Sequence, residues 1–248
     1  MFIMPEHRGE HFKKLNEGQT THFDKDYADP PKFELLSAKI DKAFGTRPFT
    51  FLDIGGGSGR LADTLLERFS NAKGVVLDNS SVLLNANKSH PRKDLVSASA
   101  ENLTSATGGR RFDIICFHWV LHHFVGHSYR ESLANIGNAL KQAKSLLNPG
   151  GYISVFENCY ESYFFDSFCS RAIFALSSSP IIAPVMKIVG VKTAGCGVCF
   201  LSKYSWLKQF SLAGIKPVEI WDDHDWRLSL TQKLSGAKRV YVSHFWCR

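Results

Sequence analysis

The stretch F-L-D-I-G-G-G-S-G, residues 51–59, predicts a buried strand that runs into a glycine-rich turn and then into a helix. Apolar residues recur at helical spacing just after it, at Leu61, Leu65, Leu66 and Phe69. Glycines allow positive φ and close approach of the backbone to a ligand, and the new helix offers unpaired N–H groups. Asp78 lies 23 residues after Gly55, at the end of the next expected strand. A carboxylate there can accept hydrogen bonds from both ribose hydroxyls of a nucleoside cofactor.

The alternation of strand and helix continues on both sides of this turn. We expect strands at 49–54, 74–78, 94–98, 112–117 and 152–156, and helices at 32–44, 80–89 and 133–147. Such alternation predicts right-handed βαβ units and a parallel sheet with helices on both faces. The strands are almost continuously apolar, which agrees with a sheet buried on both sides.

The pattern changes after Glu157. Residues 160–200 are helical or loop-like and rich in aromatic side chains, 204–212 read as a helix, and 217–222 and 239–246 read as two closing strands. The fold class is therefore α/β, with a Rossmann-like, doubly wound, seven-stranded mixed sheet and a helical insertion after the fifth strand. We expect an N-terminal helical lead-in or lid over 1–45 and a main domain over 46–248, in which the insertion at about 160–200 caps the acceptor site.

Length and composition exclude several classes of protein. The chain has 248 residues, 44% of them hydrophobic, which suits one large globular domain and excludes wholesale disorder. The net charge is +7, but basic residues cluster only in pairs, which disfavours a nucleic-acid partner. The sequence shows no signal-peptide pattern and no apolar stretch of about 18 residues, and its six cysteines are scattered. We expect a soluble, cytoplasmic, reduced protein.

Two classes of cofactor use a glycine turn of this kind. A dinucleotide places its pyrophosphate at the helix N-terminus above G-x-G-x-x-G, and G-S-G-R-L-A from Gly57 meets the variant that ends in Ala. The acidic Asp53 directly before the turn, together with the rest of the chain, argues against a dinucleotide.

Five motifs in order resemble those of the class I S-adenosylmethionine-dependent methyltransferases of the small-molecule type. They are residues 52–59, Asp78, Ser99-Ala100-Glu101-Asn102-Leu103, residues 112–124 and residues 146–152. The resemblance covers 48–158 well and 195–246 loosely. It implies S-adenosyl-L-methionine as cofactor and S-adenosyl-L-homocysteine as product. Ser99 stands where the family often has Asp. Its hydroxyl can accept a hydrogen bond from the adenine amino group, but it carries no negative charge.

The resemblance also implies a role for individual residues. Asp53, Gly55 and Gly57 would hold the methionine end of the cofactor, and Asp78 would hold the ribose. Asn79, Ser99 and Ala100 would flank the adenine. Phe117 and His118 would lie near the sulfonium and its methyl group.

Methyl transfer is an in-line displacement, so the enzyme mainly aligns the acceptor and excludes water. A hydroxyl acceptor must also lose its proton, and the imidazole pKa suits that task. His118, His122 and His123 are the candidate bases, with packing as the alternative for each. Glu157 is a candidate substrate contact at the carboxyl edge of the sheet. We expect no metal site: the histidines lack a carboxylate partner, and the lone Cys196-x-x-Cys199 lacks a second pair.

The acceptor is expected to be a small, apolar or aromatic metabolite. An aromatic cluster in the insertion would line its pocket or pack helices together: Tyr160, Tyr163, Phe164, Phe165, Phe168 and Phe174. An amphipathic membrane contact is a further, less favoured reading. An RNA or protein methyltransferase is the first alternative, although no Asn-Pro-Pro motif follows the fourth strand. A non-catalytic S-adenosylmethionine-binding module is the second. The oligomeric state is not predicted.

Overall fold

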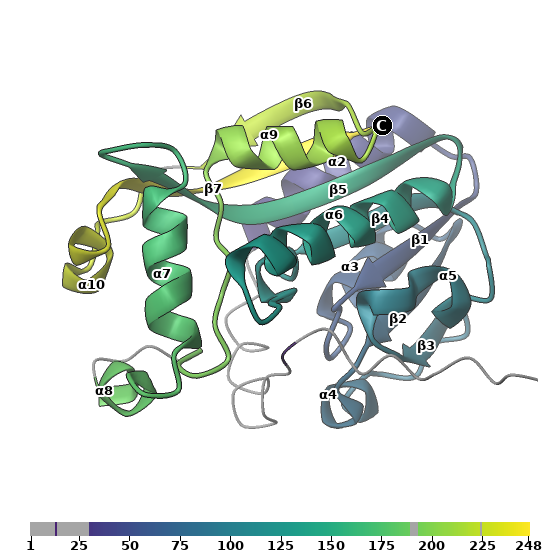
Figure 1. Ribbon diagram of the computed structural model, residues 1–248. Helices are drawn as coiled ribbons and strands as arrows, with labels where there is room; N and C mark the ends of the chain where they lie inside the picture. Colours follow the sequence, from purple (N-terminus) through teal and green to yellow (C-terminus); the bar gives the residue numbers. More distant parts are fainter. Residues whose placement is uncertain (1–12, 14–29, 189–192, 224) are drawn as a thin grey trace, which may run out of the picture.

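A seven-stranded sheet forms the centre of the molecule (Figure 1), in the order β3-β2-β1-β4-β5-β7-β6. The computed structural model describes residue 13 and residues 30–188, 193–223 and 225–248. Neighbours among the first five strands pair in parallel, and β7 is antiparallel to both β5 and β6. The α/β class and the seven-stranded mixed sheet are therefore confirmed.

The elements follow the expected alternation. The strands are β1 (Phe49–Ile54), β2 (Ala72–Asp78), β3 (Lys93–Ser97), β4 (Phe112–His118), β5 (Leu147–Ser162), β6 (Pro217–Asp222) and β7 (Ala237–Cys247). The α-helices are α2 (Pro30–Phe44), α3 (Arg60–Arg68), α4 (Ser81–Asn85), α5 (Leu103–Ala106), α6 (Tyr129–Ser145), α7 (Phe168–Ser178), α8 (Ala183–Ile188), α9 (Lys203–Leu212) and α10 (Leu230–Leu234). Two 3-10 turns are η1 (Ala100–Asn102) and η2 (Leu121–His123).

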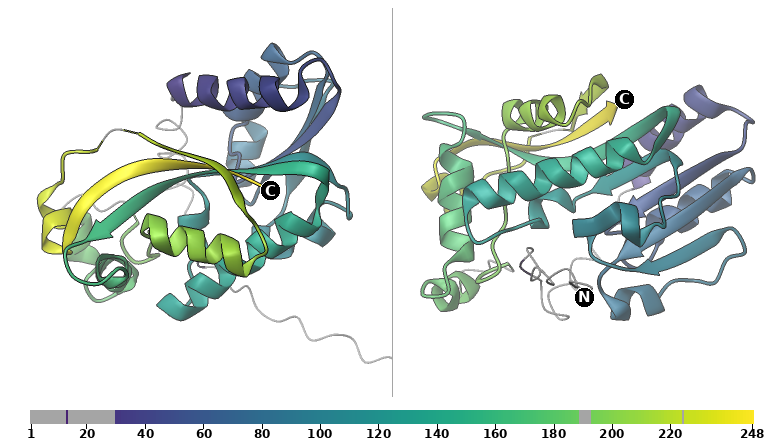
Figure 2. Two further views of the ribbon diagram at one scale, coloured as in Figure 1. Left: turned by 90° about the horizontal axis from the view of Figure 1, so that it is seen from above. Right: turned by 45° about the vertical axis from the view of Figure 1, so that its right-hand side comes forward.

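Helices cover both faces of the sheet, as Figure 2 shows from above. Helices α2 and α3 pack on one face, where Leu36, Ile40 and Leu65 belong to one buried cluster. Helices α5, α6 and α9 pack on the other, where Ile136 and Phe210 belong to a second cluster. The doubly wound arrangement follows from the apolar stripes on these helices.

Strand β5 is much longer than the expected 152–156. At its start Leu147 already pairs with Phe112, and the register then shifts before Tyr152. At its end residues 157–162 pair with β7, from Glu157 opposite Ser243 to Ser162 opposite Ala237. The extension was not predictable because its partner lies about 80 residues away in sequence. The insertion therefore begins after Ser162.

The insertion holds α7 and α8, which lie together beside the far end of β5 (Figure 1). Tyr160 and Phe174 are buried, and the Phe174 ring meets Tyr129 edge to face at 5.9 Å. The packing interpretation therefore holds for these two residues. Tyr163, Phe164 and Phe165 instead face solvent, with 59–71% of their surface exposed, so they do not line a pocket.

The N-terminal lead-in largely lies outside the described residues. The backbone N–H of Lys13 donates to the carbonyl of Val125 at 2.8 Å, just after η2. Within the described part of the chain, no helix has the length and apolar character needed to cross a bilayer.

Candidate active site

The glycine turn after β1 is held by the carboxylate at the end of β2. Gly55 and Gly57 have φ of 70° and 52°, values that favour glycine. The Gly57 N–H donates to Asp78 Oδ2 at 3.0 Å, and the Ser80 N–H donates to Asp78 Oδ1 at 2.8 Å. The structure thus brings Asp78 to the glycine turn, as the spacing predicted.

A second carboxylate lies beside the same turn. Asp53 is 3% exposed, and its Oδ2 has no hydrogen-bond partner among the described residues. Burial and, to a smaller extent, the nearby charge of Asp78 raise the pKa of Asp53 to about 7, against an opposing effect of Lys93. Two buried carboxylates in contact with one turn favour a cationic ligand and oppose a pyrophosphate. The residues present therefore fit S-adenosylmethionine, which carries an ammonium and a sulfonium group.

Residues that sequence reasoning missed support the turn from below. The Asn87 side-chain amide donates to the Gly57 carbonyl at 2.9 Å and to the Leu83 carbonyl at 3.2 Å. Lys93 Nζ is buried and lies 2.5 Å from Asp63 Oδ1. These contacts join α3, β3 and the segment after α4. The sequence around Asn87 has no local pattern that predicts its contact with the glycine turn.

The expected adenine-binding residues follow β2 and β3 at the same edge of the sheet. Asn79 is exposed directly after Asp78. Ser99 caps η1, because its hydroxyl accepts the Glu101 N–H at 3.4 Å. Ala100 is 9% exposed. This edge of the sheet therefore presents the small side chain of Ala100 together with the polar side chains of Asn79 and Ser99.

His118 ends β4 in a row of rings across three strands. It pairs with Phe156 on β5, which pairs with His244 on β7. Its Nε2 lies 2.9 Å from Ser154 Oγ, and that oxygen lies 3.1 Å from His244 Nε2. Burial lowers the pKa of His118 to about 3 and lowers that of His244 well below its usual value. Both imidazoles are therefore neutral at physiological pH.

The neighbours of His118 have different surroundings. Phe117 is fully buried against Phe124 on the opposite face, so its ring lies in the core and only its backbone reaches the edge. Trp119 has φ of 52°, and it is the only non-glycine residue with positive φ in the described segments. Such a backbone conformation costs free energy, and strained residues of this kind are often found at functional sites.

His122 and Glu157 form a buried pair on the face opposite His118. His122 Nδ1 lies 2.7 Å from Glu157 Oε2, and Oε1 accepts the N–H groups of Leu121 at 2.8 Å and His122 at 3.3 Å. Burial raises the pKa of Glu157 to about 8, against the opposing effect of these N–H groups, and lowers the pKa of His122 to about 3. At neutral pH the pair therefore shares one proton and carries no net charge.

The ring of His123 lies beside that of His122 at an angle of 45°. Its ring centroid lies 4.1 Å from that of His122, and burial, then His122, lowers its pKa well below the usual value. Of the expected catalytic residues, the structure brings His122, His123 and Glu157 together. It places His118 on the other face, the same face as Asp53.

Replacing Gly55 by alanine is expected to destabilise the protein by about 2–4 kcal/mol, because backbone strain and overpacking add. Its φ is +70°, and a Cβ atom would meet Val120 Cγ2 at 2.4 Å. Gly108 provides the matched control, since its φ is +63° but nothing lies within 4 Å of its Cβ position. Urea unfolding of both variants separates the two effects. Equal losses in the two variants would contradict the close contact with Val120.

The sheet and the glycine turn after β1 define an α/β protein with a Rossmann-like fold, and part of the chain matches a known family. Residues 52–153 match the methyltransferase domain family. No curated protein matches the chain in sequence. Over residues 52–153 the chain is similar to methyltransferase domains, which supports an S-adenosylmethionine-dependent methyltransferase with S-adenosylmethionine as its cofactor.

Solved structures share the fold at low sequence identity. A SAM-dependent methyltransferase from Leishmania major is 17% identical with a TM-score of 0.59, over 88% of this chain and 71% of that one. The plantazolicin methyltransferase BamL, solved with a triazolic desmethylPZN analogue and SAH, is 13% identical with a TM-score of 0.58, over 93% of this chain and 89% of that one. The cyclopropane synthase MmaA2 from Mycobacterium tuberculosis is 15% identical with a TM-score of 0.57, over 96% and 88%.

Proposed function

We propose that this enzyme methylates an O, N or C atom of a small, apolar or aromatic metabolite in the cytoplasm. The proposal of an apolar acceptor rests on the aromatic-rich sequence of the insertion. The six cysteines are all free, which fits a reducing compartment. Incubation with methyl-labelled S-adenosylmethionine and a panel of apolar phenols and amines tests the proposal. Label that enters only RNA or protein would contradict it.

The observation that carries the proposed cofactor site is the pair of buried carboxylates at the glycine turn. In this proposal Asp53, Gly55 and Gly57 hold the methionine end, and Asp78 holds the ribose. Asn79, Ser99 and Ala100 surround the adenine, while His118 and the backbone of Phe117 lie near the reacting methyl group. The bound cofactor supplies an electrophilic methyl group on a sulfonium.

The chain's own contribution is to align the acceptor and to handle its proton. We assign the proton to the His122–Glu157 pair. Glu157 fixes the ring of His122 through Nδ1, which leaves Nε2 as the nitrogen that accepts a proton. The pair becomes a base only after it loses its shared proton, so its basic form accumulates as the pH rises through the pKa of Glu157.

The rate of methyl transfer at saturating cofactor is therefore expected to rise with pH, by about tenfold per unit below a midpoint near 8, where the pKa of Glu157 lies. Glu157→Gln keeps the shape of the side chain but cannot ionise. We expect it to lower kcat by roughly 100-fold or more and to flatten the profile.

Two further measurements make this test specific. The affinity for S-adenosylmethionine should stay unchanged in Glu157→Gln, because Glu157 bonds to Leu121 and His122, whereas Asp78 and Asn87 hold the glycine turn. His127→Gln replaces an exposed histidine of the same loop and should keep the wild-type profile. A pH profile that Glu157→Gln leaves intact would exclude the pair as the base.

A further inference from the structure

The end of the molecule beyond β5 carries an exposed apolar tip. We define the tip as Tyr163, Phe164, Phe165, Leu230 and Leu234, which are 59–78% exposed. Its two segments lie side by side: the Tyr163 N–H donates to the Gly236 carbonyl at 3.2 Å, and a Cβ atom on Gly236 would lie 3.8 Å from the Phe164 ring. Figure 1 shows α10 and the loop after β5 at this same end.

Helix α10 presents its apolar residues outward, the reverse of an ordinary surface helix. None of its residues is buried, and Leu230 and Leu234 are 73% and 78% exposed at i, i+4 spacing. The polar side chain of Gln232 faces the protein instead and donates to the Tyr160 hydroxyl at 3.2 Å. A full capping box at Ser229 fixes the start of the helix. The outward leucines are therefore held in place by specific contacts.

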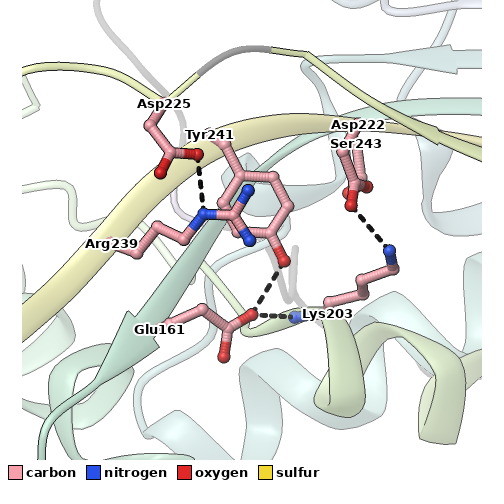
Figure 3. A network of polar contacts seen from close by, with 7 residues as sticks. All are labelled: Glu161, Lys203, Asp222, Asp225, Arg239, Tyr241 and Ser243. Carbon is pink, nitrogen blue, oxygen red and sulfur yellow. Dashed lines mark hydrogen bonds and ion pairs between the residues drawn. The ribbon is translucent and has the colours of Figure 1, made fainter.

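Basic residues flank the tip, and two nearby carboxylates, Asp222 and Asp225, form ion pairs with Lys203 and Arg239. Figure 3 shows Glu161 accepting from the Tyr241 hydroxyl at 2.9 Å and Asp225 accepting from Arg239 Nε at 2.6 Å. Asp166 accepts the hydroxyls of two serines on the segment at the start of α9. Exposed basic residues remain on the segment that carries α10, namely Arg227, Lys233 and Lys238.

We propose that the tip docks on an anionic lipid bilayer surface. Exposed aromatic and leucine side chains insert at the headgroup boundary, and flanking basic residues are attracted to anionic lipid. A second copy of the chain fits less well, because a symmetric contact would bring the same basic residues of both copies together.

The tip also lies close to the proposed acceptor site. Glu157 lies five residues before the end of β5. At the rise of a strand, this corresponds to roughly 17 Å. A bilayer at the tip would therefore hold apolar molecules near the candidate base.

The test is flotation of the whole protein with phosphatidylcholine vesicles, with and without phosphatidylserine. We expect binding to the vesicles that contain phosphatidylserine, weakened by salt. The triple variant Phe164→Ser, Leu230→Ser, Leu234→Ser should lose roughly a hundredfold or more in partitioning. Leu95→Ser with Leu212→Ser is the matched control, because these leucines are 46% and 62% exposed on β3 and α9. It should bind like the wild type.

Four results would overturn the proposal. The wild-type protein could bind neither kind of vesicle, or bind both kinds equally. The triple variant could bind the vesicles as well as the wild type does. The wild-type protein could also self-associate in solution, with the triple variant alone losing that association. The measurement needs neither the cofactor nor an acceptor. Its failure is therefore distinguishable from a failure of the proposed activity.

Discussion

Asp78→Ala is expected to weaken S-adenosylmethionine binding by about a hundredfold or more. A carboxylate at the end of β2 can accept both ribose hydroxyls, and hydrogen bonds to a charged group contribute about 1.5–3 kcal/mol each. The same side chain holds the glycine turn through the Gly57 N–H at 3.0 Å. The substitution therefore removes a cofactor contact and loosens the turn that presents the others. Titration calorimetry measures the loss directly.

Two variants separate this effect from a general loss of charge. Asp94→Ala removes an exposed carboxylate of the adjacent strand, which is paired with Arg110, and it should bind the cofactor normally. Asp78→Asn keeps the shape and one accepting oxygen, so its affinity should lie between those of the wild type and Asp78→Ala. Wild-type affinity in Asp78→Ala would exclude this residue from the ribose site.

The fold was predictable where local sequence and global structure agree. The apolar run into Gly55 defines β1 and its turn in any context, and the carboxylate of Asp78 follows at a spacing set by one βα unit. The extension of β5 to Ser162 was not predictable. Its polar residues become strand only because β7 pairs with them, and that pairing depends on tertiary structure.

The candidate site shows the same division. The glycine turn, Asp53 and Asp78 were predictable because they lie within one local unit. The partners of the histidines were not, because they depend on cross-strand register: Ser154 and His244 meet His118 from two other strands. The one sequence signal was a polar residue inside an apolar strand, as at Ser154, Glu157 and His244. A buried polar side chain needs a partner, so such a position predicts a contact without naming it.

The protein is expected to lose stability steeply in mild acid. His118, His122, His123 and His244 all have lowered pKa values in the folded state because of burial. Between about pH 6.5 and 5 the unfolded chain protonates these four histidines and the folded chain does not. Asp53 and Glu157, with pKa values raised to about 7 and 8, act in the opposite direction, because the folded state keeps their two protons.

The difference reaches about two protons more on the unfolded chain near pH 5, so the free energy of unfolding should there fall by about 3 kcal/mol per pH unit on acidification. Above about pH 6.5 the protons that the folded state keeps on Asp53 and Glu157 outnumber those on the histidines of the unfolded chain, and stability should fall again as the pH rises towards 8. The maximum therefore lies near pH 6.5. Urea unfolding at a series of pH values measures both slopes.

His244→Asn isolates one contribution to the acid slope. The variant removes one of the four histidines that the folded state keeps neutral, so the slope should fall by about one proton, or 1.4 kcal/mol per pH unit. This readout does not depend on how much the substitution destabilises the protein at neutral pH. His127→Asn changes an exposed histidine and should leave the slope unchanged. An unaltered slope in His244→Asn would mean that the folded protein protonates this imidazole, which contradicts its burial between Phe156 and Ser154.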